Sequence, residues 1–485
     1  MKRVWTGRYL LVMLGIFPLW LGLWGYRDLT AQKFAFFTSA TGVWLAGLCV
    51  LTIRERSPRI RPNAGRVWVL AFLAALCLSA LCSPFGAQTL IGVSRYDGLL
   101  TWLLYGCIFL GVSAYGRPRL AHAYALAGGG LVNCAVATVQ LLGYNFLWLF
   151  PNGWNYYDSG VYYTGEFLGL IGNADLLSAY FCLVIPVCFG LFVLYGGRKT
   201  AYLLPSGAFC TFIMLKSGVS GGLAGLIVCV LIGAPLILTD RERLIRGLVV
   251  LSLLATAGGL SAAVRFSADG PEFILCKLSA ALISAAVVSV FAGYLLAHTT
   301  IMLCKLPCVV TAVEVVCVAA ALYVIYTAPP AEGTLLELSR LLHGEVVDSF
   351  GSRRVEIWRE VWRLIQERPW LGGGPGTLES RTALEFSRVS DNGQLLRVHV
   401  DNAHNEYLNL LVNDGLVSFV PYVGLMLATL RKAWKNRRSR VVCAMLLPLL
   451  AWWGEAVFGL GLCIVLPMMW AVWGLFWTVD DNMIM

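Results

Sequence analysis

Residues 174–196 read ADLLSAYFCLVIPVCFGLFVLYG, and Asp175 is the single charged side chain in this run. A helix of this length spans about 30 Å, the thickness of the hydrocarbon core of a bilayer. Similar runs recur along the 485 residues, of which 58% are hydrophobic and 13% are charged. The sequence therefore predicts an all-α fold, a polytopic integral membrane helix bundle with about 12–14 transmembrane helices. The predicted spans are residues 9–25, 34–53, 67–82, 99–115, 120–142, 174–196, 200–216, 221–238, 247–264, 275–297, 308–328, 405–430, 441–457 and 460–478.

The basic residues predict how the bundle is oriented in the membrane. The formal net charge is +10, but the arginines and lysines are spread over every second short loop, which is typical of cytoplasmic loops and argues against a nucleic-acid partner. We expect both termini in the cytoplasm. No small-residue cleavage site follows residues 9–25, so we expect this run to be a retained span. The cysteines lie mostly inside apolar runs without paired spacing, which predicts packing residues and no disulfide framework. The loop cations include Lys2, Arg66, Arg117, Arg198, Arg243 and Arg438.

One loop, residues 329–403, is long and polar, and the alternation places it outside the cytoplasm. It divides the chain into an N-terminal bundle (1–328), an extracytoplasmic loop (329–403) and C-terminal transmembrane helices (404–485). Within the loop we expect a short helix from Thr334 to His343, with a capping box between Thr334 and Glu337. A second amphipathic helix is expected over residues 352–368. A smaller aromatic loop, 143–173, predicts either an interfacial belt or a sugar-stacking surface.

The polar sequence DNAHNEY, residues 401–407, enters the apolar run that follows it. An imidazole there has a pKa near neutrality, so His404 can accept a proton from an attacking hydroxyl as a general base. Asp401, Asn405 and Glu406 would support it. The alternative is that His404 only helps these neighbours to cap the helix.

Two arginines, Arg353 and Arg354, stand where the second loop helix is expected to begin. A positive charge there opposes the helix dipole, so we infer that an anion such as a diphosphate compensates it. Arg95, before the fourth span, is a further candidate for the same anion. The alternatives are exposed arginines or lipid head-group contacts, and for Arg95 a salt bridge to Asp97.

Two other patterns in the loop predict no cofactor. The glycines of residues 372–376 lack the Lys-Ser or Lys-Thr of a phosphate-binding loop, so we expect a tight turn after Pro369. His343 and His399 could be combined with His404, but the spacing is not that of a zinc site. We therefore expect neither metal nor cofactor.

Taken together, these segments resemble the O-antigen ligase and polymerase superfamily of bacterial membrane glycosyltransferases. The resemblance covers roughly residues 80–460. In one respect the chain departs from the family: many members have an arginine at the outer end of a middle span, where this chain reads SGVSGG over residues 217–222. Lys216 and Arg265 are the candidates to replace that arginine as a diphosphate ligand. The matching motifs are residues 351–358 (GSRRVEIW), 367–377 (ERPWLGGGPGT), 404–408 (HNEYL) with Gly415, 95–98 (RYDG) and 172–180 (GNADLLSAY).

The resemblance implies a C-type glycosyltransferase fold in the bacterial cytoplasmic membrane, with the active site outside the cytoplasm. It implies transfer of a glycan from undecaprenyl diphosphate to a hydroxyl of a glycan, lipid or protein acceptor. We expect inversion at the anomeric carbon, His404 as the base and no metal. The alternatives are a polysaccharide polymerase of the same superfamily and a lipid-linked glycan transporter. Against transport, Glu314 and Glu455 are nearly the only ionisable residues expected inside the spans.

Overall fold

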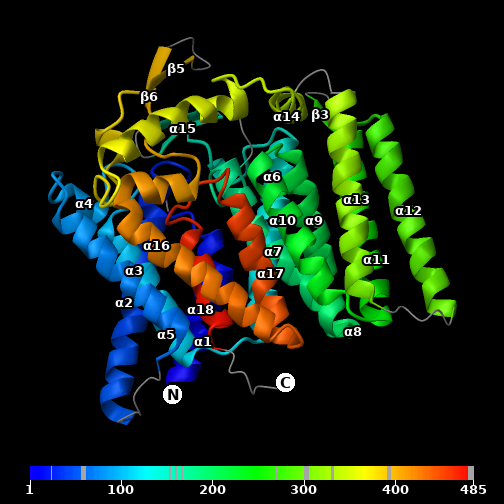
Figure 1. The fold of residues 1–485 in the computed structure, drawn as a ribbon, viewed down its shortest axis with the longest axis horizontal. Coiled ribbons are helices and arrows are strands. Elements are labelled where there is room, and N and C mark those ends of the chain that lie inside the picture. Colours follow the sequence, from blue (N-terminus) through cyan, green and yellow to red (C-terminus); the bar gives the residue numbers. More distant parts are fainter. Residues whose placement is uncertain are drawn as a thin grey trace.

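The computed structural model describes residues 1–22, 25–55, 62–151, 154–158, 161–164, 168–267, 270–299, 305–328, 333–389 and 395–478. Within these ranges, nine helices are long and apolar enough to cross a membrane. They pack side by side in one bundle (Figure 1). The prediction of an all-α, polytopic membrane protein is confirmed.

The N-terminal part of the chain supplies most of the bundle (Figure 1). Two short hairpins interrupt it, β1–β2 (Asn155–Asp158 and Val161–Thr164) and β3–β4 (Val264–Ser267 and Gly270–Phe273). The helices are α1 (Lys2–Leu11), α2 (Leu29–Glu55), α3 (Ala64–Leu81), α4 (Gln88–Ile91), α5 (Leu99–Tyr115), α6 (Leu120–Leu141), α7 (Ala174–Tyr195), α8 (Gly197–Ala201), α9 (Leu204–Lys216), α10 (Ser220–Ile237), α11 (Arg241–Ala263), α12 (Lys277–His298) and α13 (Leu306–Thr327).

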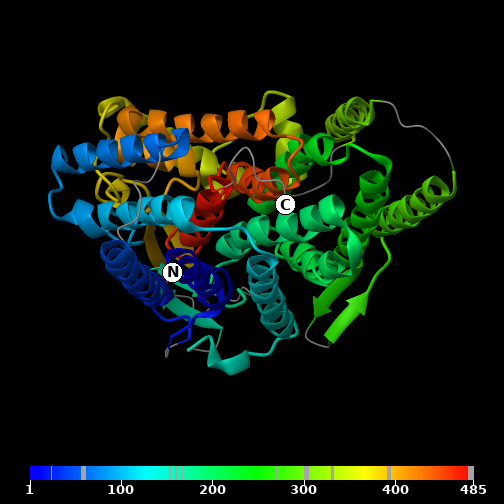
Figure 2. The same cartoon turned by 90° about the horizontal axis from the view of Figure 1, so that it is seen from below.

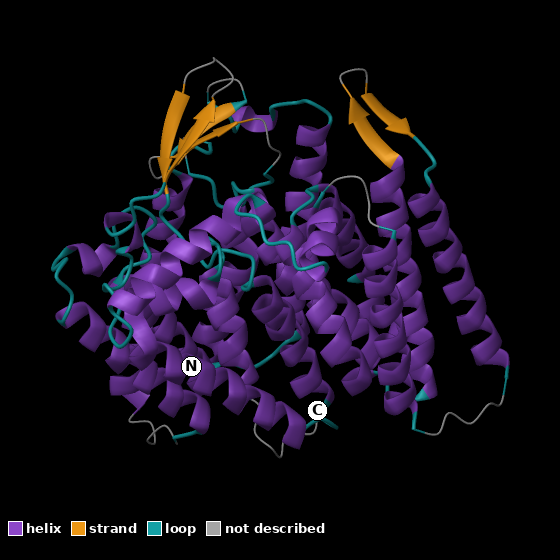
Figure 3. Ribbon diagram, turned by 45° about the horizontal axis from the view of Figure 1, so that its top comes forward, coloured by secondary structure: helices purple, strands orange, loops and turns teal. Residues whose placement is uncertain are grey.

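The C-terminal part begins with the loop predicted to be polar and returns to the bundle. The loop carries α14 (Thr334–Leu342), α15 (Phe350–Glu367) and the hairpin β5–β6 (Glu385–Val389 and Leu395–His399). Three helices follow it, α16 (Glu406–Lys435), α17 (Arg440–Glu455) and α18 (Leu466–Phe476). The strands lie at the end of the molecule opposite the N-terminus (Figure 3).

Burial separates the helices into a core and a lipid-facing edge. In α7, 89% of the most apolar window is buried against other helices, whereas in α13 the value is 0%. Both are apolar all round, so sequence alone does not distinguish them. Figure 2 shows α12 and α13 at the edge of the bundle away from α1. Many of their large apolar side chains are exposed, as expected of a surface that faces lipid.

Several predicted runs form shorter elements than expected. The run 9–25 is helical only to Leu19, as α1 continues through a π-helical turn (Val12–Ile16) and a 3₁₀ turn (Phe17–Leu19). Pro18 and the left-handed Gly22 prevent the helix from continuing. The run 460–478 is helical only from Leu466.

The long loop differs from the prediction at both of its helices. The capping box is wrong: α14 begins after Gly333 without a side-chain cap, and the Glu337 carboxylate instead accepts a hydrogen bond from the Gly351 amide at 3.0 Å. The second helix begins at Phe350, but Gly351, Ser352 and Arg353 have positive φ angles of 63°, 58° and 68°. Regular helix therefore begins at Arg354.

The aromatic loop contributes to a small core and not only to an interface. Tyr156 is 1% exposed and packs with Tyr26, Leu149 and Phe150, while Trp148 is 85% exposed. The side chains of Tyr157, Tyr162 and Tyr163, which also belong to this loop, lie outside the described set. Tyr156 is thus not available to stack on a sugar.

The expectation that Glu314 and Glu455 are nearly the only ionisable residues inside the spans is wrong. Lys33, in α2, is fully buried and donates to the carbonyls of the Phe17–Leu19 turn. Glu406 and Asp414, in α16, are 5% and 1% exposed. Hydropathy is averaged over a whole run, so one charged residue lowers the average only slightly. The sequence pattern therefore does not reveal such a residue.

Candidate active site

A cavity of about 740 Å³ lies between the long loop and the bundle. Its walls come from segments far apart in the sequence, which meet at the end of the molecule that carries α15 and the strands (Figure 1). Polar and charged side chains line much of it. These are Arg95, Asn173, Asp175, Ser217, Ser220, Thr334, Glu337, Ser352, Arg354, His399, Asp401, Asn402 and His404.

His404 stands in a tight turn just before α16. Its φ of 48° is left-handed, a conformation that costs a non-glycine residue about 1 kcal/mol or more. The turn is held by the Asn402 side chain, which accepts from the His404 amide at 2.9 Å. On the other side, the Trp358 indole of α15 donates to the Ala403 carbonyl at 2.9 Å. The backbone strain is thus supported from two elements.

Helix capping does not explain His404. The N-cap of α16 is Asn405, whose side chain accepts from the Leu408 amide at 3.0 Å. Within the described residues the imidazole of His404 makes no hydrogen bond, and it lines the cavity. The ring is therefore placed to meet a ligand.

The surroundings of His404 favour its neutral form. Burial is the largest influence and lowers its pKa below the ordinary 6.5. The positive charges of Arg354 and Arg95 act in the same direction, whereas Asp175 and Asp401 oppose them. A neutral imidazole at physiological pH can accept a proton, which is the state that a general base requires.

Arg95 is held by a buried ion pair. Its Nε lies 2.5 Å from Oδ2 of Asp401, and the two side chains are 9% and 13% exposed. The partner is Asp401 and not Asp97, which was the alternative from sequence. Because Asp401 is three residues before His404, this ion pair fixes the loop that carries Arg95 (the arginine loop) to the turn that carries His404 (the histidine turn).

Arg354 points a guanidinium into the same cavity from the start of regular helix in α15. Its side chain is 13% exposed and its closest acidic partner, Asp175, is 3.9 Å away. A second long contact, 3.5 Å, joins it to the Ser220 hydroxyl. Both contacts are at the limit for an ion pair and a hydrogen bond, so an anionic ligand can compete for this guanidinium.

The other predicted diphosphate ligands do not line the cavity. Arg353 pairs with Glu356 at 2.8 Å and stacks on Phe386, because the left-handed turn directs it away from Arg354. Lys216 donates to the carbonyls of Ser261 and Val264. Arg265 is exposed in β3, opposite Glu272. The structure therefore does not support these three residues as ligands.

Glu406, predicted to support the site, acts inside the bundle. Its carboxylate accepts from Tyr422 at 2.7 Å and from Trp452 at 3.1 Å, and its amide donates to the Ala456 carbonyl at 2.8 Å. It fixes the start of α16 against α17 and is not among the residues that line the cavity.

Helix N-termini converge on the cavity. Asn173 caps α7 there, Ser220 begins α10 without a side-chain cap, and α14, α15 and α16 begin nearby at Gly333, Arg354 and Glu406. Each N-terminus carries a partial positive charge, and those of α10 and α14 have no side-chain cap for their first amides. The cavity therefore attracts anions through its backbone as well as through arginines.

The glycine-rich turn is structural, as predicted. We call residues 369–376 the glycine clasp. Gly415, with φ 68° and ψ −177°, kinks α16 and interrupts its backbone hydrogen bonds. The clasp replaces some of them, because the Gly373 and Gly374 amides donate to α16 carbonyls at 3.2 and 2.6 Å. Two α16 amides beyond the kink donate back to the Pro369 and Trp370 carbonyls at 2.9 and 3.0 Å. The amides of Gly373 and Gly374 are thus not available to a phosphate.

The clasp also connects the two halves of the site. Ser79 of α3 and Ser83, which follows that helix, donate to clasp carbonyls at 2.7 and 2.5 Å. The Val93 amide donates to the Gly376 carbonyl at 3.0 Å. Val93 is two residues before Arg95, and α16 follows His404. The clasp therefore sets the distance between the arginine loop and the histidine turn.

Sequence reasoning missed Asp175 and Ser220 as residues of the site. Asp175 was visible as the one charge in the run 174–196, and Ser220 as part of the departure from the family pattern. Of the three histidines considered for a metal, His399 and His404 line the cavity, whereas His343 stacks on Tyr326. In the part of the chain that the structure describes, no three His, Cys, Asp or Glu side chains are grouped to hold a metal ion.

Comparison with known proteins agrees with the motifs. Residues 273–423, which include α15, the glycine clasp and His404, match the family described as O-antigen ligase. The O-antigen ligase of Pseudomonas aeruginosa is 33% identical over 106 residues. That alignment covers 22% of this chain and 24% of the relative. Both matches cover part of the chain and support its resemblance to the O-antigen ligase superfamily.

Proposed function

We propose that the protein transfers a glycan from undecaprenyl diphosphate to an acceptor hydroxyl on the outer face of the bacterial cytoplasmic membrane. One observation carries the proposal: His404, with a pKa below 6.5, shares a cavity of about 740 Å³ with Arg354, Arg95 and several helix N-termini. This combination supplies a base and an anion site within one space.

The proposed reaction is a single displacement. The acceptor oxygen attacks the anomeric carbon as its proton passes to Nδ1 or Nε2 of His404, and the bond from that carbon to the diphosphate oxygen breaks. The configuration inverts. Undecaprenyl diphosphate leaves with the bonding electron pair, and the released proton is later lost from His404 to water.

The diphosphate is expected to sit between Arg354 and the start of α10. Arg354 has only long contacts to Asp175 and Ser220, so it can turn to a phosphate oxygen. The uncapped α10 N-terminus supplies amide donors where many relatives are expected to have an arginine. Arg95, paired with Asp401, would act mainly by holding the histidine turn.

Because fixed positive groups already face the leaving group, we propose that no divalent metal is needed. The same chemistry serves ligation and polymerisation, which differ in the acceptor. The name of the Pseudomonas relative leads us to propose ligation.

The test is transfer of glycan from purified undecaprenyl diphosphate donor by the detergent-solubilised protein with EDTA present. We expect His404→Ala to lower the rate by about 10²–10⁴-fold, the usual contribution of a general base, and Arg354→Ala by about 10²–10³-fold. Arg265→Gln, which removes an exposed arginine outside the cavity, is the matched control. Near-normal transfer by His404→Ala would overturn the mechanism. If wild type releases no lipid diphosphate with any acceptor, transport replaces transfer as the better function.

A further inference from the structure

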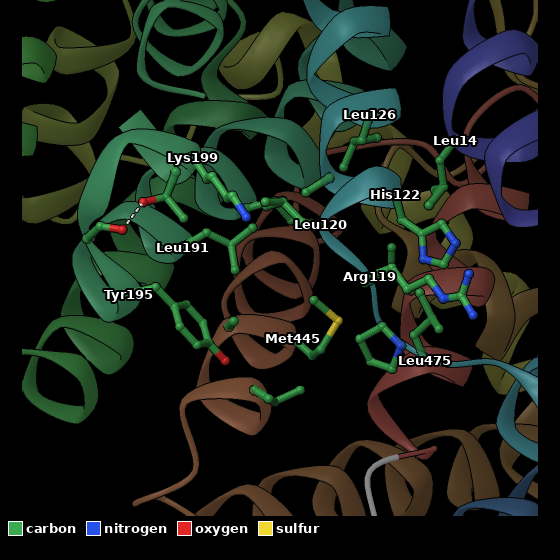
Figure 4. Close-up of a pocket in the computed structure, with 18 residues that line it drawn as sticks. Leu14, Arg119, Leu120, His122, Leu126, Leu191, Tyr195, Lys199, Met445 and Leu475 are labelled. Atoms are coloured by element: carbon green, nitrogen blue, oxygen red, sulfur yellow. Dashed lines mark hydrogen bonds between the residues drawn. The ribbon is translucent and has the colours of Figure 1, made fainter. Parts of the chain in front are cut away.

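A second cavity, of about 350 Å³, opens at the end of the bundle that carries the N-terminus and α8. It lies between α6, α7, α17 and α18, and Figure 4 shows its side chains. This volume is within the usual range for small-molecule sites. Its walls are almost entirely apolar and include Leu14, Leu120, Leu126, Leu191, Met445 and Leu475.

Two cations, a tyrosine and a histidine also line this cavity. Arg119 lines it from the loop before α6 and Lys199 from the short helix α8; in Figure 4 they lie on different sides of the cavity, with Tyr195 on the side of Lys199. Among the described residues neither cation forms an ion pair. His122 also lines the cavity; it is 5% exposed, and its Nδ1 has no hydrogen-bond partner in the described part of the chain. The site thus combines two uncompensated positive charges and a buried imidazole nitrogen with an apolar interior.

This arrangement fits one class of ligand. A soluble anion such as a free phosphate would satisfy the cations but would leave the apolar walls in contact with water. A neutral hydrocarbon would occupy the apolar interior but would leave the two cations without a partner. A membrane lipid with an anionic head group satisfies both, since basic residues at the membrane surface attract such lipids and acyl chains bury in apolar clefts.

We propose that this cavity binds an anionic glycerophospholipid from the leaflet at the N-terminal end of the bundle. Its anionic head group lies at the rim that carries Arg119 and Lys199, and an acyl chain extends along Leu191 and Met445. The site is separate from the candidate active site, because α7 begins at that cavity with Asn173 and ends at this one with Tyr195.

The proposal predicts selective binding, and the test does not use glycan transfer. The full-length protein is delipidated in a neutral detergent and titrated with phosphatidylglycerol or with phosphatidylcholine of the same acyl chains. Native mass spectrometry counts the bound lipid, and thermal unfolding measures the stabilisation that binding gives. Inorganic phosphate is a third probe.

Three variants complete the experiment. Arg119→Gln with Lys199→Gln removes both charges from the exposed rim and should leave folding intact. Leu191→Trp narrows the apolar interior while keeping the charges. Arg54→Gln, at the exposed end of α2, removes a basic residue outside the cavity and is the matched control.

We expect wild type and Arg54→Gln to bind phosphatidylglycerol at least tenfold more tightly than phosphatidylcholine. The double variant should lose this preference, because each surface cation contributes about a fivefold gain in affinity for anionic lipid. Leu191→Trp should weaken both lipids. Equal binding of the two lipids by wild type would overturn the proposal, as would stabilisation by inorganic phosphate alone or full selectivity in the double variant.

Discussion

Replacing Gly415 by alanine tests whether the glycine clasp positions the active site. The kink at Gly415 has φ 68° and ψ −177°, a region that is almost restricted to glycine and costs other residues about 1–3 kcal/mol. A Cβ there would also lie 2.2 Å from the Trp370 carbonyl oxygen and 2.4 Å from its carbon. Both atoms belong to backbone, so a side-chain rotation cannot relieve the clash.

The expected loss of stability follows from these two terms. Overpacking of a close backbone contact adds about 1–3 kcal/mol, which gives about 2–6 kcal/mol together with the strain. We expect the apparent melting temperature of Gly415→Ala to fall by about 5 °C or more. Because the clasp sets the distance between Arg95 and His404, glycan transfer should also fall at temperatures where the variant remains folded.

The control is Gly128→Ala in α6. A Cβ at Gly128 meets no atom within 4 Å, and its φ is not positive, so alanine there should be neutral or slightly stabilising. Thermal unfolding in detergent and single-turnover transfer are measured for both variants. If Gly415→Ala has the melting temperature and the transfer rate of wild type, the clasp does not hold α16 as described.

Three further predictions concern the candidate site. The rate of transfer should fall below pH 6.5, because His404 then gains a proton and ceases to act as a base. Arg354→Gln removes a charge that lowers the pKa of His404, so this fall should move to higher pH. Asp175→Asn removes a charge that raises the same pKa, so the fall should move to lower pH. A profile that is the same in both variants would contradict the assignment of this fall to His404. Trp358→Phe removes the indole that donates to the Ala403 carbonyl in the histidine turn. The rate should fall about tenfold, the effect of one buried unsatisfied carbonyl, while KM for the donor stays within twofold. An unchanged rate would show that the turn does not need this hydrogen bond. Arg265→Gln should transfer at the wild-type rate, and a large loss would return that arginine to the list of ligands.

The sequence predicted the site residues whose type is unusual at their position in the chain. His404 and Arg354 stand where a charge or an imidazole is otherwise unfavourable, and the structure brings both to one cavity. Sequence could not separate Arg354 from Arg353, because the choice depends on three left-handed residues that turn one side chain inward and its neighbour outward.

The failures have a common physical cause. Hydropathy predicts that Lys216 and Arg265 lie near the ends of apolar runs, and the structure has Lys216 at the end of α9 and Arg265 in β3, just after α11. Hydropathy indicates depth in the membrane and not the direction in which a side chain points. The same limit applies to α7 and α13, since each is apolar on all sides although one is central and the other faces lipid. The hairpins were missed because strands of four or five residues contain too few positions for an alternating pattern to be recognised.

The convergence of helix N-termini has a consequence for how such proteins can diverge. A positive potential made by peptide groups is present whatever side chains the helices carry, so point substitutions can weaken it but cannot remove it. The backbone potential at this cavity therefore does not depend on an arginine within residues 217–222. In the proposed mechanism the imidazole of His404 has no such substitute, because no backbone group can accept a proton in its place, so the transfer step would depend on one side chain.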